Sequence, residues 1–170
     1  VLARPGVQKV LEVGPGSWHF AGAILGAGAA ITALELPFQR SAALRPAGAA
    51  AWFSWRPHPL PWPTGYFGAA YQRNSVPNME TADISRALAE IARVADSFVW
   101  IGDLRCRFPI RPGGWVRSRI LEHFAIESEQ GEKQWRVMVL RPLRLAHEPS
   151  CSPELPPKLD EGESRRACAM

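Results

Sequence analysis

One stretch constrains the fold of this chain more than any other: an apolar run at residues 10–13 leads directly into a turn that contains two glycines. The stretch reads Val-Leu-Glu-Val-Gly-Pro-Gly-Ser over residues 10–17. Such a run predicts a buried strand, and Glu12 is its one charged residue. Glycines directly after a strand leave backbone N–H groups unobstructed, so a nucleotide-like ligand can lie close to the main chain at the start of the next helix.

The rest of the chain alternates strand patterns with helical patterns. The segment 56–65 is rich in proline and predicts a loop, because proline cannot continue a regular element. Strand and helix in alternation, followed by a terminal hairpin, predict a doubly wound α/β sheet with an antiparallel edge. The expected strands are 9–13, 30–36, 50–55, 66–72, 98–102, 125–128 and 135–140, and the expected helices are 17–26, 39–44, 81–94 and 114–124.

Length and composition bound the domain organisation. A chain of 170 residues with 46% hydrophobic and 21% charged residues suits one globular domain. We expect this domain over residues 1–147 and a disordered, proline-rich and charged tail over residues 148–170. No apolar run reaches the roughly 18 residues that would cross a bilayer.

The cysteines and the net charge indicate the compartment and the kind of partner. The chain has 3 cysteines, which are scattered and lack metal-ligand spacing, so the sequence predicts neither a disulfide framework nor a metal site. A reducing compartment, the cytoplasm, is the expectation, and no membrane partner is expected. The net charge of +4 permits attraction to an anionic substrate or a nucleic acid, although an ordinary solvated surface is the simpler interpretation.

The glycine stretch resembles the first motif of the class I S-adenosylmethionine-dependent methyltransferases, in which an acid near the strand end precedes Gly-x-Gly-x-Gly. Glu12, Gly14 and Gly16 fit this motif, and Trp18 stands at the position of the third glycine. The resemblance implies that Glu12, Gly14 and Gly16 line an S-adenosylmethionine site.

Glu35 is expected at the end of the second strand, beside the glycine turn. An acid at this position of a doubly wound sheet can accept hydrogen bonds from both ribose hydroxyls of a nucleotide. Leu36, next to Glu35, is then a candidate for apolar contact with the adenine ring. The alternative is that Glu35 is a helix-capping or solvated acid.

Two further stretches resemble the same family. Residues 60–71 are similar to the Leu-Pro-Phe-x-Asp-x-x-Phe-Asp-x-Val segment before the fourth strand, but Thr64 and Gly68 replace the aspartates. Arg56 falls near an adenine-contacting aspartate of those enzymes. Residues 87–94 resemble the helix before the fifth strand. Together these resemblances imply a Rossmann-like seven-stranded sheet with an antiparallel C-terminal hairpin strand, and S-adenosylmethionine as cofactor.

Methyl transfer is an in-line displacement from an activated sulfonium, so a protein mainly aligns the donor and the acceptor and excludes water. The residues expected near the acceptor follow the fourth strand: Asn74, Ser75 and Asn78, with Tyr71 behind them. The candidates for a catalytic role are His19, Asn74 and Asn78, and Asn74 is also expected to contact the cofactor. His19 can serve as a general base, although a histidine at a helix start more often caps or packs.

Two clusters of side chains have both a structural and a functional interpretation. Trp52, Trp55 and Trp62 can stack a base or an aromatic acceptor, or can belong to the core. The arginines that follow the fifth strand can attract a phosphate or carboxylate substrate, or can solvate a loop. They are Arg105, Arg107, Arg111, Arg117 and Arg119.

The leading hypothesis is a methyltransferase that acts on a small molecule, with RNA or protein acceptors as open alternatives. The main rival is a catalytically inactive methyltransferase-like binding or scaffold module, because Trp18, Arg56, Thr64 and Gly68 depart from the family pattern. A nicotinamide-dependent oxidoreductase is a third possibility, but its Gly-x-Gly-x-x-Gly motif requires glycine where this chain has His19.

Overall fold

The computed structural model describes residues 6–15, 18–34, 45–52, 59–107, 110–132 and 135–143, and every structural statement below refers to these residues. Helices and strands alternate through most of this part of the chain. Their bounds in chain order are β1 (Lys9–Val13), α1 (Ala21–Gly26), β2 (Ala30–Leu34), β3 (Ala50–Trp52), β4 (Ala69–Arg73), the 3₁₀ turn η2 (Val76–Asn78), α2 (Thr81–Val94), β5 (Phe98–Asp103), β6 (Cys106–Arg107), β7 (Ile110–Arg111), α3 (Gly113–Leu121), β8 (Phe124–Gln130) and β9 (Trp135–Pro142).

Seven of the strands form one twisted sheet in the order β3-β2-β1-β4-β5-β9-β8. The strands from β3 to β5 are parallel, whereas β9 runs antiparallel to both of its neighbours, β5 and β8. The sequence-based prediction of a seven-stranded doubly wound sheet with an antiparallel C-terminal hairpin is confirmed. Because the parallel strands end at one edge, the turns after β1, β4 and β5 meet there.

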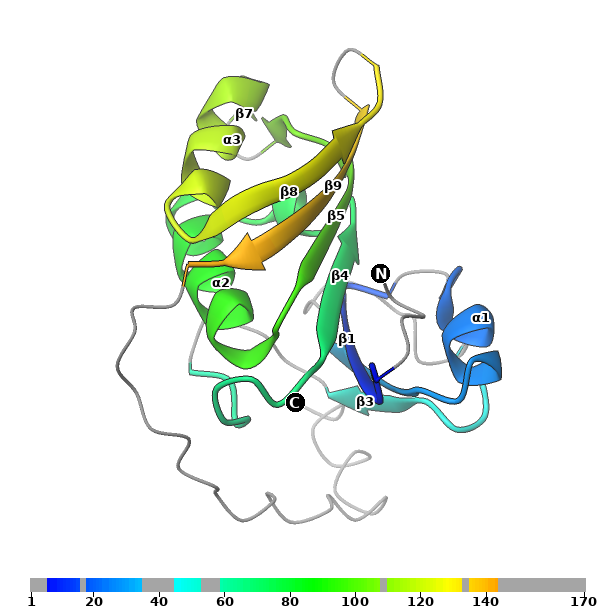
Figure 1. Ribbon diagram of the computed structural model, residues 1–170. Coiled ribbons are helices and arrows are strands. Elements are labelled where there is room, and N and C mark those ends of the chain that lie inside the picture. The colour runs from blue at the N-terminus through cyan, green and yellow to red at the C-terminus, as the bar shows by residue number, and fades with distance from the viewer. Residues whose placement is uncertain are drawn as a thin grey trace, which may run out of the picture.

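Helices cover both faces of the sheet (Figure 1): α2 and α3 pack on one face and α1 on the other. The prediction for α2 is confirmed at both ends, because its apolar residues recur with helical spacing and face the sheet. The buried residues of α2 are Ile84, Ala87, Leu88, Ile91, Ala92 and Val94. Among the described helices, none is long and apolar enough to cross a membrane.

The first helix begins later than the sequence predicts. We expect it from Ser17, which lies outside the described residues, but α1 begins at Ala21 with Phe20 as its N-cap residue. Trp18 has a φ of 55°, which no residue of a right-handed helix adopts. The left-handed residue therefore holds the chain in a turn before the helix can begin.

Smaller differences concern the elements around β5. The fourth strand is expected from Tyr66 but begins at Ala69, because Phe67 pairs with Ala95 in an isolated bridge outside the main ladder. The short hairpin of β6 and β7 is not predicted, because strands of two residues carry no periodicity. The predicted helix 39–44 lies outside the described residues.

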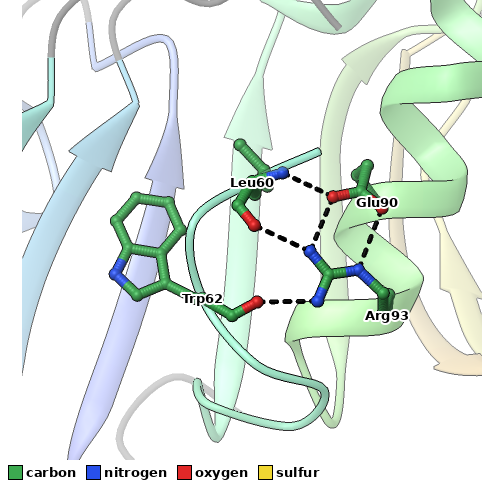
Figure 2. Close-up of polar contacts among 4 residues, drawn as sticks. All are labelled: Leu60, Trp62, Glu90 and Arg93. Carbon is green, nitrogen blue, oxygen red and sulfur yellow. Dashed lines mark hydrogen bonds and ion pairs between the residues drawn. The ribbon is translucent and has the colours of Figure 1, made fainter. Parts of the chain in front are cut away.

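A polar clamp holds the proline-rich loop against α2 (Figure 2). The guanidinium of Arg93 donates hydrogen bonds to the carbonyl oxygens of Trp62 (2.6 Å) and Leu60 (2.9 Å), and it also binds both oxygens of Glu90. The Leu60 N–H donates to the Glu90 carboxylate at 2.6 Å. The clamp fixes the backbone from which the side chains of Leu60 and Trp62, 5% and 7% exposed, enter the core.

The clamp makes stability depend on pH. Burial raises the pKa of Glu90, but the hydrogen bonds from Arg93 and Leu60 and the Arg93 charge outweigh it and hold the pKa below its ordinary value of 4.5. A lowered pKa in the folded state contributes stability at neutral pH that is lost as the pH falls through the folded pKa. We expect the free energy of unfolding to fall as the pH drops below about 5, and E90Q to lack that share of the fall.

Urea unfolding of wild type and E90Q across this pH range measures the loss of stability. The matched control is E127Q, which changes an exposed carboxylate on β8 and leaves the clamp intact. Parallel pH profiles for wild type and E90Q would show that Glu90 contributes nothing to acid sensitivity.

Candidate functional site

The glycine turn lies at the end of β1, where the parallel strands present their carboxyl ends. Gly14 has a φ of 68°, and its N–H donates to the carbonyl oxygen of Leu34 at 2.9 Å, which ties the turn to the end of β2. Trp18 closes the turn through its own N–H, which donates to the carbonyl oxygen of Pro15 at 2.9 Å. Gly16 lies outside the described residues.

Trp18 occupies the position of the third motif glycine and keeps a glycine-like backbone, with a φ of 55°. Its indole is only 5% exposed and belongs to the apolar cluster between α1 and the sheet. Other members of this cluster are Val10, Ala21, Ile24, Ile31 and Tyr71. The tryptophan therefore preserves the path of the turn while its side chain serves the core.

Glu12 is buried at the end of β1 and lies beside Tyr71 of β4. The two residues are register partners on adjacent parallel strands, and they are 4% and 0% exposed. Burial raises the pKa of Tyr71, and the neighbouring Glu12 raises it further. The phenol therefore stays protonated beside Glu12, beneath the glycine turn.

A buried polar network ties together the carboxyl ends of β1, β4 and β5. The Ser75 hydroxyl donates to the carbonyl oxygen of Val13 at 2.5 Å. The amide oxygen of Gln72 accepts the Ser75 N–H at 2.9 Å, and its amide nitrogen donates to the carbonyl oxygen of Ile101 at 3.3 Å. Gln72 and Ser75 are 0% and 1% exposed, so this buried network fixes the backbone of the turn that follows β4.

Asn74 and Gly102 approach each other closely at the ends of β4 and β5. Asn74 has a φ of 55°, and its side-chain oxygen accepts the Asp103 N–H at 2.9 Å. Gly102 has a φ of 125°, and a Cβ added there would lie 1.9 Å from the same Asn74 oxygen. Asn78 donates from its side chain to the carbonyl oxygen of Asn74 at 2.5 Å. Only glycine at position 102 admits this arrangement.

The structure brings some of the expected site residues together and leaves others untested. Glu12, Gly14 and Asn74 lie at the same edge of the sheet, on β1 and β4 and in the turns that follow them. His19 and Asn78 are exposed. Gly16, Glu35, Leu36 and Arg56 lie outside the described residues, as does the expected tail, so these predictions remain predictions.

The clusters of tryptophans and arginines have mainly structural contacts where they are described. Trp62 is buried in the core, 5.1 Å from the Phe67 ring centroid. The side chains at positions 52, 55 and 107 lie outside the described part of the structure. Three of the arginines form ion pairs: Arg105 with Asp103, Arg117 with Glu129, and Arg119 with Glu122.

Reasoning from the sequence missed Gln72 and Gly102. A glutamine inside an otherwise apolar strand is a signal for a buried polar network, since an unpaired amide would be costly there. The glycine at the end of β5 is likewise a signal for a close approach of a neighbouring residue.

Comparisons with known proteins support the fold. No model of a known family and no curated protein matches this sequence. Solved structures do match: a methyltransferase from Mesorhizobium loti that depends on S-adenosylmethionine has 16% identity, covers 81% of this chain and 93% of its own, and has a TM-score of 0.60. An O-methyltransferase family protein from Burkholderia thailandensis has 10% identity, 83% and 54% coverage, and a TM-score of 0.63.

A third match is an O-methyltransferase of neocarzinostatin biosynthesis, solved with S-adenosylhomocysteine and 1,4-dihydroxy-2-naphthoic acid. It has 17% identity and a TM-score of 0.61, and the alignment covers 84% of this chain but 51% of that protein. The chain thus spans about half the length of both O-methyltransferases. Taken with the strand order, the matches show that the chain has the fold of the class I S-adenosylmethionine-dependent methyltransferases.

Proposed function

We propose that the chain binds S-adenosylmethionine at the carboxyl ends of β1 and β2 and transfers its methyl group to a small molecule. The observation that carries the proposal is the left-handed glycine turn at Gly14, directly after the buried Glu12, in a sheet with the class I strand order. A turn of this kind lets a ligand approach the main chain without meeting a side chain.

The cofactor residues follow from this placement. Gly14 and Gly16 would face the cofactor with their backbone, and the buried Glu12 lies at the end of β1 beneath the turn. Glu35 would accept the hydrogen bonds of the ribose hydroxyls, and Leu36 would contact the adenine. Asn74 would border both the cofactor and the acceptor, since it follows β4 at the same edge.

S-adenosylmethionine supplies an activated methyl group, so the chain itself has to orient the acceptor and exclude water. The network of Gln72, Ser75 and Asn74 fixes the backbone on the acceptor side. Asn78 and His19 are exposed near this edge, where each can hydrogen-bond an acceptor, and His19 can take up a proton from a hydroxyl or amine. Two of the structural matches are named O-methyltransferases, which supports a hydroxyl acceptor.

A catalytically inactive binding module remains the second candidate. It is favoured by Trp18 in the motif turn and by Thr64 and Gly68, which replace motif acids. An inactive module that keeps the ligand would bind S-adenosylhomocysteine and transfer no methyl group to any acceptor.

Replacing Glu35 tests the cofactor assignment. We expect E35A to weaken the binding of S-adenosylhomocysteine by about 1–3 kcal/mol, because charged hydrogen bonds to the ribose would be lost. Isothermal titration calorimetry of the folded proteins measures this loss. The matched control is E122A, an exposed acid directly after α3, which should bind as tightly as wild type. Equal affinities for wild type and E35A would show that the ribose lies elsewhere.

A further inference from the structure

A row of side chains crosses three strands on the sheet face that carries α1. Arg73 at the end of β4 is the register partner of Ile101 on β5, which in turn pairs with Val137 on β9. Alternate residues of a strand share a face, so Arg73 lies on the same face as Tyr71, a member of the cluster beneath α1. Ile101 packs partly against that cluster.

The row ends beside an exposed aromatic side chain. Trp135 opens β9, next to Asp103 at the end of β5, and it shares a face with Val137 because Met138 and Leu140 point into the opposite core. The side chains of Trp135 and Val137 remain 44% and 39% exposed. Figure 1 shows the start of β9 beside the end of β5, at the carboxyl edge of the parallel strands.

The charge on this surface is positive but small. Asp103, on the same face as Ile101, is paired with Arg105 at 2.6 Å, whereas Arg136 lies on the opposite face with Met138, where Glu129 engages it at 3.0 Å. Arg73 is exposed and forms no ion pair within the described part of the chain. The Arg73 guanidinium therefore lies at one end of an apolar and aromatic surface that spans three neighbouring strands and is about 10 Å wide.

We propose that the surface formed by Arg73, Ile101, Val137 and Trp135, here called the acceptor ledge, binds a planar aromatic molecule that carries a carboxylate or similar anion. The aromatic rings lie on Ile101 and Val137 against Trp135, and the anion pairs with Arg73. This inference rests on the proposed function, because it names the class of molecule that receives the methyl group.

Nucleic acid is the other anionic partner that aromatic and basic residues can bind, but the ledge fits it less well. Single-stranded nucleic acid is held by a positively charged groove that follows its backbone over several nucleotides. On the ledge, Asp103 engages the neighbouring Arg105, so Arg73 leaves a charge suited to one anionic group.

Titration with 2-naphthoate and its neutral counterpart 2-naphthamide tests the ledge, with and without saturating S-adenosylhomocysteine. We expect wild type to bind 2-naphthoate roughly tenfold more tightly than 2-naphthamide, because about one charged hydrogen bond is worth that difference in affinity. R73Q should bind the two probes equally, and W135A should weaken both. The matched control is R141Q, because Arg141 is an exposed arginine of β9 at the opposite end of that strand from Trp135.

Two results would overturn the ledge: equal binding of the two probes by wild type, or the same loss of naphthoate affinity in R73Q and R141Q. Tighter binding of a single-stranded RNA 20-mer than of naphthoate at equal salt would likewise replace it with a nucleic-acid surface. Circular dichroism confirms that each variant is folded. The cofactor titration tests a separate claim. If the protein binds S-adenosylhomocysteine but not naphthoate, only the ledge is refuted. If it binds naphthoate but not S-adenosylhomocysteine, only the cofactor assignment is refuted.

Discussion

Replacing Gly102 with alanine should lower the free energy of unfolding by about 2–6 kcal/mol, because backbone strain and overpacking each cost about 1–3 kcal/mol. The new Cβ would lie 1.9 Å from the Asn74 side-chain oxygen, and the φ of 125° is one that side chains rarely adopt. Asn74 cannot move aside freely, since the same oxygen accepts the Asp103 N–H at 2.9 Å. Urea unfolding followed by circular dichroism measures the loss.

Gly22 provides the matched control for Gly102. It lies in α1, a Cβ there would meet nothing within 4 Å, and alanine is the better helix former. G22A should therefore leave the stability unchanged or raise it by up to about 1 kcal/mol. If G102A and G22A changed stability alike, the close approach between β4 and β5 would be refuted.

Replacing Trp18 should also lower the free energy of unfolding strongly. The relative stability of two variants, W18A and W18G, identifies the cause. W18A removes a buried indole and should lower the free energy of unfolding by about 3–5 kcal/mol. W18G leaves the same space but relieves the left-handed backbone at φ 55°, so W18G should be more stable than W18A by about 1 kcal/mol. Urea unfolding of both variants measures this difference.

The control for Trp18 is an exposed alanine of the neighbouring helix. Ala23 lies in α1 with ordinary helical geometry, so A23G should cost about 0.5–1 kcal/mol. The glycine variant should therefore be less stable than the alanine form at position 23 and more stable than it at position 18. The same order at both positions would contradict the left-handed turn at Trp18.

The sequence predicts the sheet well because hydrophobic periodicity determines it. The apolar run around Glu12, the helical spacing in 81–94 and the terminal strand pair each reflect burial on a defined face, and each is found in the structure. The start of α1 is predicted wrongly, because its position depends on the left-handed Trp18, and a tryptophan gives no local signal for positive φ.

The candidate site is less predictable because pairing across strands creates it. The contact of Glu12 with Tyr71, and that of Asn74 with Gly102, join residues far apart in the sequence. Likewise, the acceptor ledge depends on the register that places Trp135 beside Asp103. Residue types name the candidates, such as Glu12 and Asn74, but only the register shows which of them meet.

Calorimetric titration of the folded wild-type protein with S-adenosylmethionine, and with its demethylated product S-adenosylhomocysteine, tests the central claim most directly. The glycine turn after Glu12 in a class I fold predicts saturable binding of both molecules at one site. Adenosine monophosphate at equal concentration serves as the control and should compete weakly, since it lacks the amino acid part. A folded sample that binds neither S-adenosylmethionine nor S-adenosylhomocysteine would contradict the assignment of this edge of the sheet as a methyl donor site.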